Sequence, residues 1–191
     1  MLFKIKSYFL FLVKSTNQHG VHSPFVYSLV TKCFYNRTKR KSYGKIQSII
    51  NKNSNVGITL NSAKLLNRTI PYFDYKKVLI LKKKTDTIAQ IISENNEIFT
   101  YTSFQNDIVF DLVFLDIDYF TSNMDVLNTI IKSTHNDSLL LINSIRYTKQ
   151  NFDLWNTIKK HPKVTVTIDT YSLGFVFFRT EQAKEHFIIR K

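Results

Sequence analysis

The segment from Lys77 to Ile92 constrains the fold of this chain more than any other. It opens with a short apolar run, Val78–Leu81, of the kind that forms a strand buried on both faces of a sheet. A polar loop follows, and isoleucines then recur at helical spacing from Ile88. A strand, a loop and a helix in this order open a doubly wound α/β sheet, whose ligands bind beyond the carboxyl ends of the strands. The sequence therefore predicts a mostly parallel sheet with its site at that edge.

The other predicted strands complete such a sheet. Residues 109–118 give the strongest signal, an almost continuous apolar run that closes with two carboxylates. Residues 163–169 alternate apolar residues with threonines, and residues 174–178 can pair with them as an antiparallel hairpin. We also expect strands over residues 97–101, 138–142 and 187–190. The predicted fold is an α/β, Rossmann-like domain whose mostly parallel sheet carries a C-terminal antiparallel hairpin.

Residues 1–70 are expected to form a helical extension packed on a sheet domain of residues 71–191. One helical face of residues 1–14 carries Leu2, Ile5, Phe9, Leu12 and Val13. This pattern favours a helix that packs through that face on the domain, over an export signal or a membrane-surface anchor. A further helix is predicted over residues 59–68 and is expected to end before the proline at position 71. No run approaches the ~20 apolar residues that span a bilayer.

Composition limits the cellular compartment and the classes of binding partner that we expect. Cys33 is the one cysteine, so an internal disulfide is excluded, and a reducing, cytoplasmic compartment is expected. Its apolar neighbours indicate a core residue. The formal net charge of +13 attracts polyanions at low salt. A nucleic-acid interface through Lys82–Lys84 and the basic turn at residues 36–41 is possible but not favoured, because the turn has few aromatic neighbours.

Candidate site residues follow the first and third predicted strands. The loop after residue 81 contains three lysines, Thr85 and Asp86, and it has no glycine that would let the backbone approach a ligand closely. If the strand over residues 109–118 is continuous, Asp116 and Asp118 share one face and point into the crevice at its end. The alternative is that Asp116 caps the next turn and Asp118 is exposed. No third ligand accompanies the two carboxylates, so no metal site is predicted.

Three segments carry a resemblance to a known family. HGVHSPFVY (residues 19–27), FDLVFLDID (110–118) and the run from WNTIKK to FIIR (155–190) together resemble a bacterial family of class I S-adenosylmethionine-dependent methyltransferase-like proteins. The resemblance implies the class I methyltransferase fold, with S-adenosylmethionine as the cofactor. It makes Thr85, Asp86, Asp116 and Asp118 the candidate cofactor-binding residues, and it identifies no catalytic residue.

The chain departs from the family at the cofactor motif. The family's acidic, glycine-rich loop is replaced here by the segment from Ile80 to Asp86, and a family Asp-Asp pair by Asn143 and Ser144. Of the family's crevice carboxylates, Asp116 is the one that plainly matches. We therefore expect weakened or lost cofactor binding, with a binding or scaffold role. The alternatives are an active methyltransferase with a divergent cofactor pocket and a basic polyanion-binding module.

Overall fold

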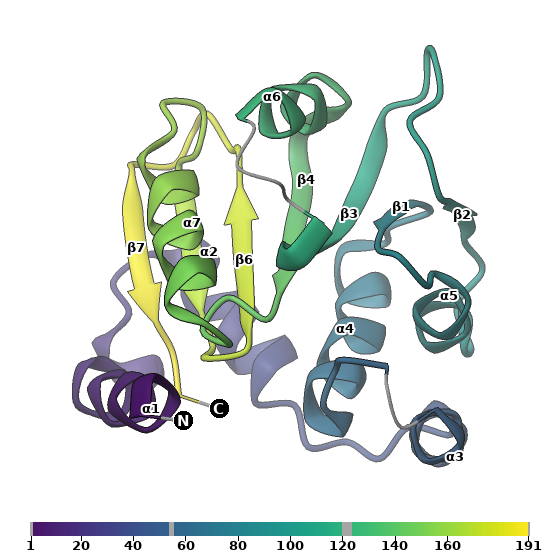
Figure 1. The fold of residues 1–191 in the computed structure, drawn as a ribbon, viewed down its shortest axis with the longest axis horizontal. Helices are drawn as coiled ribbons and strands as arrows, with labels where there is room; N and C mark the ends of the chain where they lie inside the picture. Colours follow the sequence, from purple (N-terminus) through teal and green to yellow (C-terminus); the bar gives the residue numbers. More distant parts are fainter. Residues whose placement is uncertain (1, 54–55, 120–123, 191) are drawn as a thin grey trace.

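The computed structural model describes residues 2–53, 56–119 and 124–190, and it contains one seven-stranded sheet with helices on both faces (Figure 1). The strand order is β2-β1-β3-β4-β6-β5-β7. The strands are β1 (Lys77–Leu81), β2 (Phe99–Tyr101), β3 (Phe110–Asp116), β4 (Thr134–Asn143), β5 (Val166–Asp169), β6 (Leu173–Phe177) and β7 (Glu185–Ile188).

The directions of the strands confirm the predicted fold class. β1 pairs in parallel with both β2 and β3, and β3 pairs in parallel with β4. β6 is antiparallel to β4 and to β5, which is the expected C-terminal hairpin. The segment FIIR contributes to β7, which adds a parallel strand to the outer side of β5. The carboxyl ends of β1, β3 and β4 therefore meet along one edge of the sheet.

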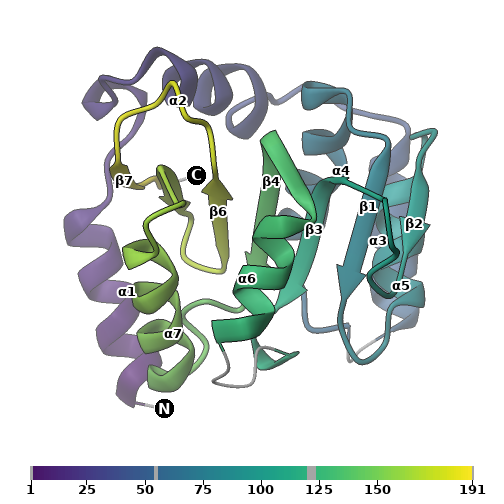
Figure 2. The same ribbon diagram turned by 90° about the horizontal axis from the view of Figure 1, so that it is seen from above.

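The helices form a layer on each face of the sheet (Figure 2). On one face lie α2, α3, α4 and α5, and on the other lie α6 and α7, with α1 beside α7 at the β7 edge. A hydrophobic core lies on each face of the sheet. Alternate residues of the central strands contribute to the two cores, because successive side chains of a strand point to opposite faces. The helices are α1 (Leu2–Lys14), α2 (Pro24–Leu29), α3 (Ser42–Lys52), α4 (Leu60–Phe73), α5 (Asp86–Ser93), α6 (Met124–Lys132) and α7 (Lys149–Lys160).

The prediction for the first helix was right about its existence and wrong about its packed face. α1 contacts the domain through Ser7 and Phe11, which are buried. The face expected to pack is turned to solvent, with Leu2 85% and Phe9 66% exposed. On the packed face, Ser7 Oγ accepts a hydrogen bond of 3.2 Å from Nη1 of the buried Arg146, and the Phe11 ring contacts that of Tyr171. None of the described helices is long and apolar enough to cross a bilayer.

The helix predicted to end before Pro71 instead continues through it, and α4 ends at Phe73 with Pro71 inside. Proline has no N–H to donate to the carbonyl four residues earlier, which is that of Asn67. Asn96 supplies the missing donor, because its Nδ2 lies 3.2 Å from Asn67 O. A side chain from beyond α5 thus satisfies the carbonyl that would otherwise oppose a proline at this position.

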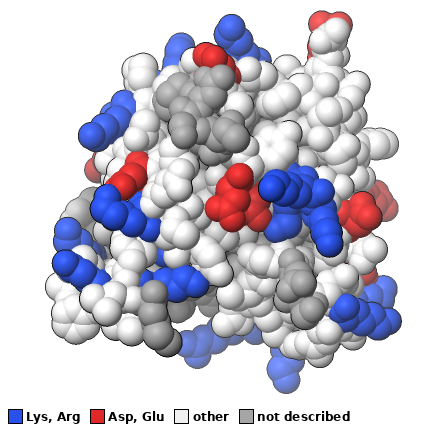
Figure 3. Space-filling view, viewed as in Figure 1, with Lys and Arg blue, Asp and Glu red and all other residues white. Residues whose placement is uncertain are grey.

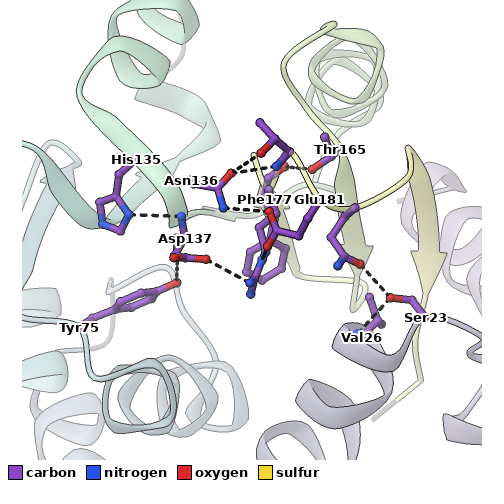
Figure 4. A network of polar contacts seen from close by, with 12 residues as sticks. Ser23, Val26, Tyr75, His135, Asn136, Asp137, Thr165, Phe177 and Glu181 are labelled. Carbon is purple, nitrogen blue, oxygen red and sulfur yellow. Dashed lines mark hydrogen bonds and ion pairs between the residues drawn. The ribbon is translucent and has the colours of Figure 1, made fainter.

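Polar contacts close the amino edge of the sheet, opposite the ends named above (Figure 4). Tyr75 Oη donates to Asp137 O at 2.9 Å, and Asn136 Nδ2 donates to Glu181 Oε2 at 2.9 Å. Hydrogen bonds from Asn136 and from Arg179 lower the pKa of the Glu181 carboxyl to about 2. These contacts hold the start of β4 to Tyr75, before β1, and to the segment after β6, which leaves the carboxyl edge as the place for a site.

Candidate functional site at the carboxyl edge of the sheet

A partly buried ion pair crosses the gap between the ends of β1 and β3. Lys82 Nζ lies 2.6 Å from Asp116 Oδ2, and the two side chains are only 11% and 14% exposed. Lys82 is the first residue after β1 and Asp116 is the last of β3, so the pairing of these adjacent strands brings them together. The lysine side chain lies across the crevice where the topology of the sheet would place a ligand.

The segment before α4 covers this ion pair. Lys82 Nζ also donates to Val56 O at 2.8 Å, and Asn143 Nδ2, at the end of β4, donates to Gly57 O at 2.9 Å. Gly57 has φ +72°, and a Cβ built there would lie 3.2 Å from Lys82 Nζ. A glycine is needed because the backbone turns in the left-handed region directly against the ammonium. The covering segment is thus fastened by side chains from two strand ends.

One carboxylate oxygen of Asp116, Oδ1, is buried and has no hydrogen-bond partner among the residues that the structure describes. Asp118 lies apart from it. The strand stops at Asp116 and residues 117–119 form a 3₁₀ turn, so the condition for a shared strand face fails. Asp118 is exposed and its Oδ1 accepts a hydrogen bond of 3.1 Å from Asn151 Nδ2. Figure 3 shows acidic side chains over this turn beside basic ones over the β1–α5 loop.

Thr85 and Asp86 lie at the start of α5, away from the ion pair. Thr85 Oγ1 donates to Asp86 Oδ1 at 3.4 Å on the surface. Both residues line a shallow polar hollow together with Lys83 and Lys84. Of the four candidate cofactor-binding residues, the structure therefore places Asp116 in the crevice and the other three outside it. Their role in cofactor binding stays a prediction.

A cleft of about 670 Å³ opens beside the ion pair, between the end of β4, the segment before α4 and the β5–β6 turn. Two of its residues, Ser144 (φ 66°) and Tyr171 (φ 76°), have left-handed backbones although neither is glycine. Such strain costs about 1–3 kcal/mol at each residue and concentrates at functional sites. The cleft has the volume of a small-molecule site. Its wall is formed by Lys4, Ile50, Asn51, Asn53, Val56, Gly57, Ile58, Thr59, Asn143, Ser144, Arg146, Tyr147, Tyr171 and Ser172.

Sequence reasoning identified Lys82, Asp116, Asn143 and Ser144 as the residues at this edge, but it missed the covering segment. Gly57 carried a usable signal, because the chain has only 4 glycines and this one lies just before the helix predicted over residues 59–68. Tyr171 carried none, since its place in the cleft depends on the turn between β5 and β6. In the described part of the chain no three His, Cys, Asp or Glu side chains gather as a metal site would require.

No protein-family model matches this sequence, and no curated protein matches it. Several solved structures are similar to this chain in fold. A proposed caffeoyl-CoA O-methyltransferase from Staphylococcus aureus superposes with a TM-score of 0.56 at 12% identity, over 73% of this chain and 93% of that chain. A methyltransferase from Geobacter sulfurreducens gives a TM-score of 0.52 at 10% identity, over 76% and 92% of the two chains.

A third similar structure, the methyltransferase from Podospora anserina bound to S-adenosylhomocysteine, gives a TM-score of 0.51 at 8% identity. It covers 83% of this chain and 97% of that chain. This chain has a methyltransferase fold. The predicted Rossmann-like architecture is confirmed, including the antiparallel C-terminal strand pairing. At these identities the likeness concerns the fold, so the activity must be argued from the residues of the site.

Proposed function

We propose that this chain is a binding protein built on a methyltransferase fold, in which S-adenosylmethionine binding is weakened or lost. The observation that carries the proposal is the position of Lys82 Nζ, 2.6 Å from Asp116 Oδ2 and 2.8 Å from Val56 O. These contacts place a side chain in the crevice at the sheet edge where a ligand of this fold would lie. The residues present therefore do not fit the cofactor.

Charge supports the same conclusion. S-adenosylmethionine carries a positively charged sulfonium, and an ammonium within a few Å of it raises the energy of the complex, most strongly where water is excluded. Asp116 is the carboxylate that could offset that charge, but one of its oxygens already pairs with Lys82. Displacing Lys82 to admit the cofactor would break its ion pair with Asp116 and its hydrogen bond to Val56 O.

The 670 Å³ cleft is the surface that we assign to ligand binding. Its polar groups are mainly amides and hydroxyls, with two tyrosines and the ammonium of Lys4, which lies 3.4 Å from the centre of the Tyr147 ring, so it suits a small polar or aromatic molecule. Arg146, which also lines the cleft, is paired with Asp169 through contacts of 2.9 and 2.7 Å and so adds no free charge. A binding role requires no cofactor and agrees with a crevice filled by the chain itself.

Calorimetry of the full chain with S-adenosylmethionine and S-adenosylhomocysteine tests the proposal. We expect no saturable heat at ligand concentrations of about 1 mM, whereas micromolar binding of either molecule would overturn the loss of cofactor binding. Lys82→Ala and Lys83→Ala form a matched pair, because the second lysine is exposed. If Lys82 blocks the crevice, affinity for S-adenosylhomocysteine rises in Lys82→Ala and not in Lys83→Ala.

The second candidate is an active methyltransferase with a divergent pocket. Asp116 Oδ1 favours it, because this buried carboxylate oxygen receives no hydrogen bond from the described residues and is available to a ligand hydroxyl or ammonium. In that case Asp116→Ala abolishes turnover, with Asp153→Ala, an exposed aspartate on α7, as the control that retains it. The polyanion-binding alternative is weakened because Lys82 is used inside the molecule, which leaves Lys83 and Lys84 exposed.

A further inference from the structure

A second cavity, of about 610 Å³, lies between α1, α7 and the outer strands β5 and β7. Much of its wall is apolar: Phe3 and Leu10 come from α1, Phe152 and Trp155 from α7, and Ile188 from β7. Aromatic and aliphatic side chains on three elements thus surround a space large enough for a small molecule. The cavity is distinct from the crevice that holds Lys82.

The charges around this cavity are almost all positive. Lys6, Lys14 and Lys159 line it, and none of the three forms an ion pair with the residues that the structure describes. The one acid in the wall is Asp169. Its Oδ2 accepts hydrogen bonds from Arg146, and its Oδ1 accepts one of 2.8 Å from the backbone N–H of Tyr171. The acid is therefore already satisfied by the chain.

Lys159 is the cation most affected by this arrangement. Burial lowers the pKa of its ammonium, and although Asp169 opposes the effect, the positive charges of Arg146, Lys14 and Lys160 add to it. The side chain is half-buried, with Nζ 6.0 Å from the centre of the Trp155 ring. A partly desolvated cation among like charges is stabilised by an anion placed beside it.

We propose that the cavity binds an anionic amphiphile, a single alkyl chain that ends in a carboxylate or a phosphate monoester. The alkyl chain would lie against Leu10 and Phe152, which still have exposed apolar surface to bury, and the head group would meet Lys159 and the lysines of α1. A neutral amphiphile would leave the cations unpaired and a cationic one would be repelled. The inference concerns a separate site and does not depend on the fate of the cofactor crevice.

The chain provides its own probe, because Trp155 is its one tryptophan and lines the cavity. Titration of the full chain with dodecanoate below its micelle concentration should change the Trp155 fluorescence saturably, with one site by calorimetry. Dodecanol and dodecyltrimethylammonium should bind at least about tenfold more weakly, since they lack the anion. Equal affinity for dodecanol and dodecanoate, or no saturable signal with dodecanoate, would overturn the proposal.

Lys159→Met and Lys160→Met are matched variants at adjacent positions of α7, because Lys160 is exposed and does not line the cavity. We expect dodecanoate affinity to fall about tenfold in Lys159→Met and to stay unchanged in Lys160→Met. Equal affinities in the two variants would contradict the assignment. If Lys159→Met does not fold, as judged by circular dichroism, Lys14→Met on the opposite wall replaces it with the same expected loss.

Sedimentation with phosphatidylcholine vesicles that contain lysophosphatidic acid, a single-chain phosphate monoester, identifies the source of the amphiphile. Pelleting of the wild-type chain that is lost in Lys159→Met indicates a phosphate head group of a bilayer lipid. Retained dodecanoate binding without pelleting indicates a free fatty-acid anion. Both outcomes support the cavity as the binding site, whereas pelleting that Lys159→Met leaves intact, together with no response to dodecanoate, would count against it.

Discussion

Asn143 and Gly57 are 86 residues apart in the sequence, yet the side-chain amide of the first donates a hydrogen bond of 2.9 Å to the carbonyl of the second. Lys82 makes the equivalent contact with the neighbouring carbonyl of Val56. The segment before α4 is therefore held over the sheet edge by the residues that follow or end β1 and β4. In this molecule the strand ends bind the protein's own backbone where related folds bind ligands.

The first prediction concerns the ion pair under this segment. Asp116→Ala should lower the free energy of unfolding by about 3 kcal/mol, because it leaves the ammonium of Lys82 partly buried without its counter-ion. Urea unfolding followed by circular dichroism measures the change. Asp118→Ala is the control, since that carboxylate is exposed, and it should cost less than about 1 kcal/mol.

The double variant Lys82→Met/Asp116→Ala distinguishes a pair from two independent contributions. If the pair acts as a unit, the double variant is more stable than the sum of the two single losses predicts, by about 1–3 kcal/mol. If the losses in unfolding free energy of the two single variants simply add, the 2.6 Å contact between Lys82 and Asp116 contributes little to stability.

The sequence predicted the sheet well because its evidence is local. Val78–Leu81 and residues 139–142 are apolar without interruption, and a strand buried on both faces needs no more than that. The packed face of α1 was predicted wrongly for the opposite reason. Both sides of that helix are apolar, and the packed side is the one whose residues meet distant partners: Ser7 meets Arg146, which lies 139 residues away, and Phe11 meets Tyr171. Contacts of that range leave no periodic signal.

For the candidate site too, the sequence identified individual residues but not the contacts between distant segments. The lysine-rich loop was expected to crowd a ligand, and Asp116 was expected at the end of its strand, so the two halves of the ion pair were both identified. Their contact, and the carbonyls of Val56 and Gly57 above it, could not be predicted, because they depend on where the connection between α3 and α4 lies. Asp118 failed as a crevice residue because a 3₁₀ turn replaces the last residues of the expected strand.

The second prediction uses two glycines in different surroundings. A Cβ at Gly174 would lie 2.6 Å from Cζ3 of Trp155, whereas one at Gly44 would meet no atom within 4 Å. Gly174→Ala should therefore destabilise the protein by about 1–3 kcal/mol and alter the tryptophan fluorescence, because the indole must shift. Gly44→Ala, in the helix α3, should stabilise it by up to about 1 kcal/mol. Equal effects of the two substitutions in urea unfolding would contradict the packing of Trp155 on β6.

The third prediction concerns the thiol of Cys33. The side chain is buried, and burial raises the pKa of the thiol, so the reactive thiolate is scarce near neutral pH. The folded protein should react with an aromatic disulfide reagent many times more slowly than the urea-unfolded protein, which should release one equivalent of the chromophore. Equally fast labelling of both states would show that the α2 region opens readily.

The fourth prediction is a pH dependence at the amino end of β1. Asp111 Oδ2 accepts hydrogen bonds from the backbone N–H groups of Lys76 (2.7 Å) and Lys77 (2.8 Å), and Oδ1 contacts His135 at 3.0 Å. Burial disfavours the carboxylate, but the hydrogen bonds from Lys77, Lys76 and His135 outweigh it and lower the pKa of Asp111. Because the folded pKa is below the unfolded value of about 3.9, the stabilisation is present above that pH and is lost as the pH falls through the folded pKa.

Asp111→Asn should therefore be less stable than the wild-type chain by about 2 kcal/mol at pH 7, and the gap should narrow as the pH falls below about 4. Urea unfolding of both proteins across that range measures it, and the difference between them cancels the contributions of the other carboxylates. Glu97→Gln is a suitable control, since it removes an acid while keeping the contacts of Asp111. A gap that stays constant down to about pH 2 would mean that the hydrogen bonds do not depend on the charge of Asp111.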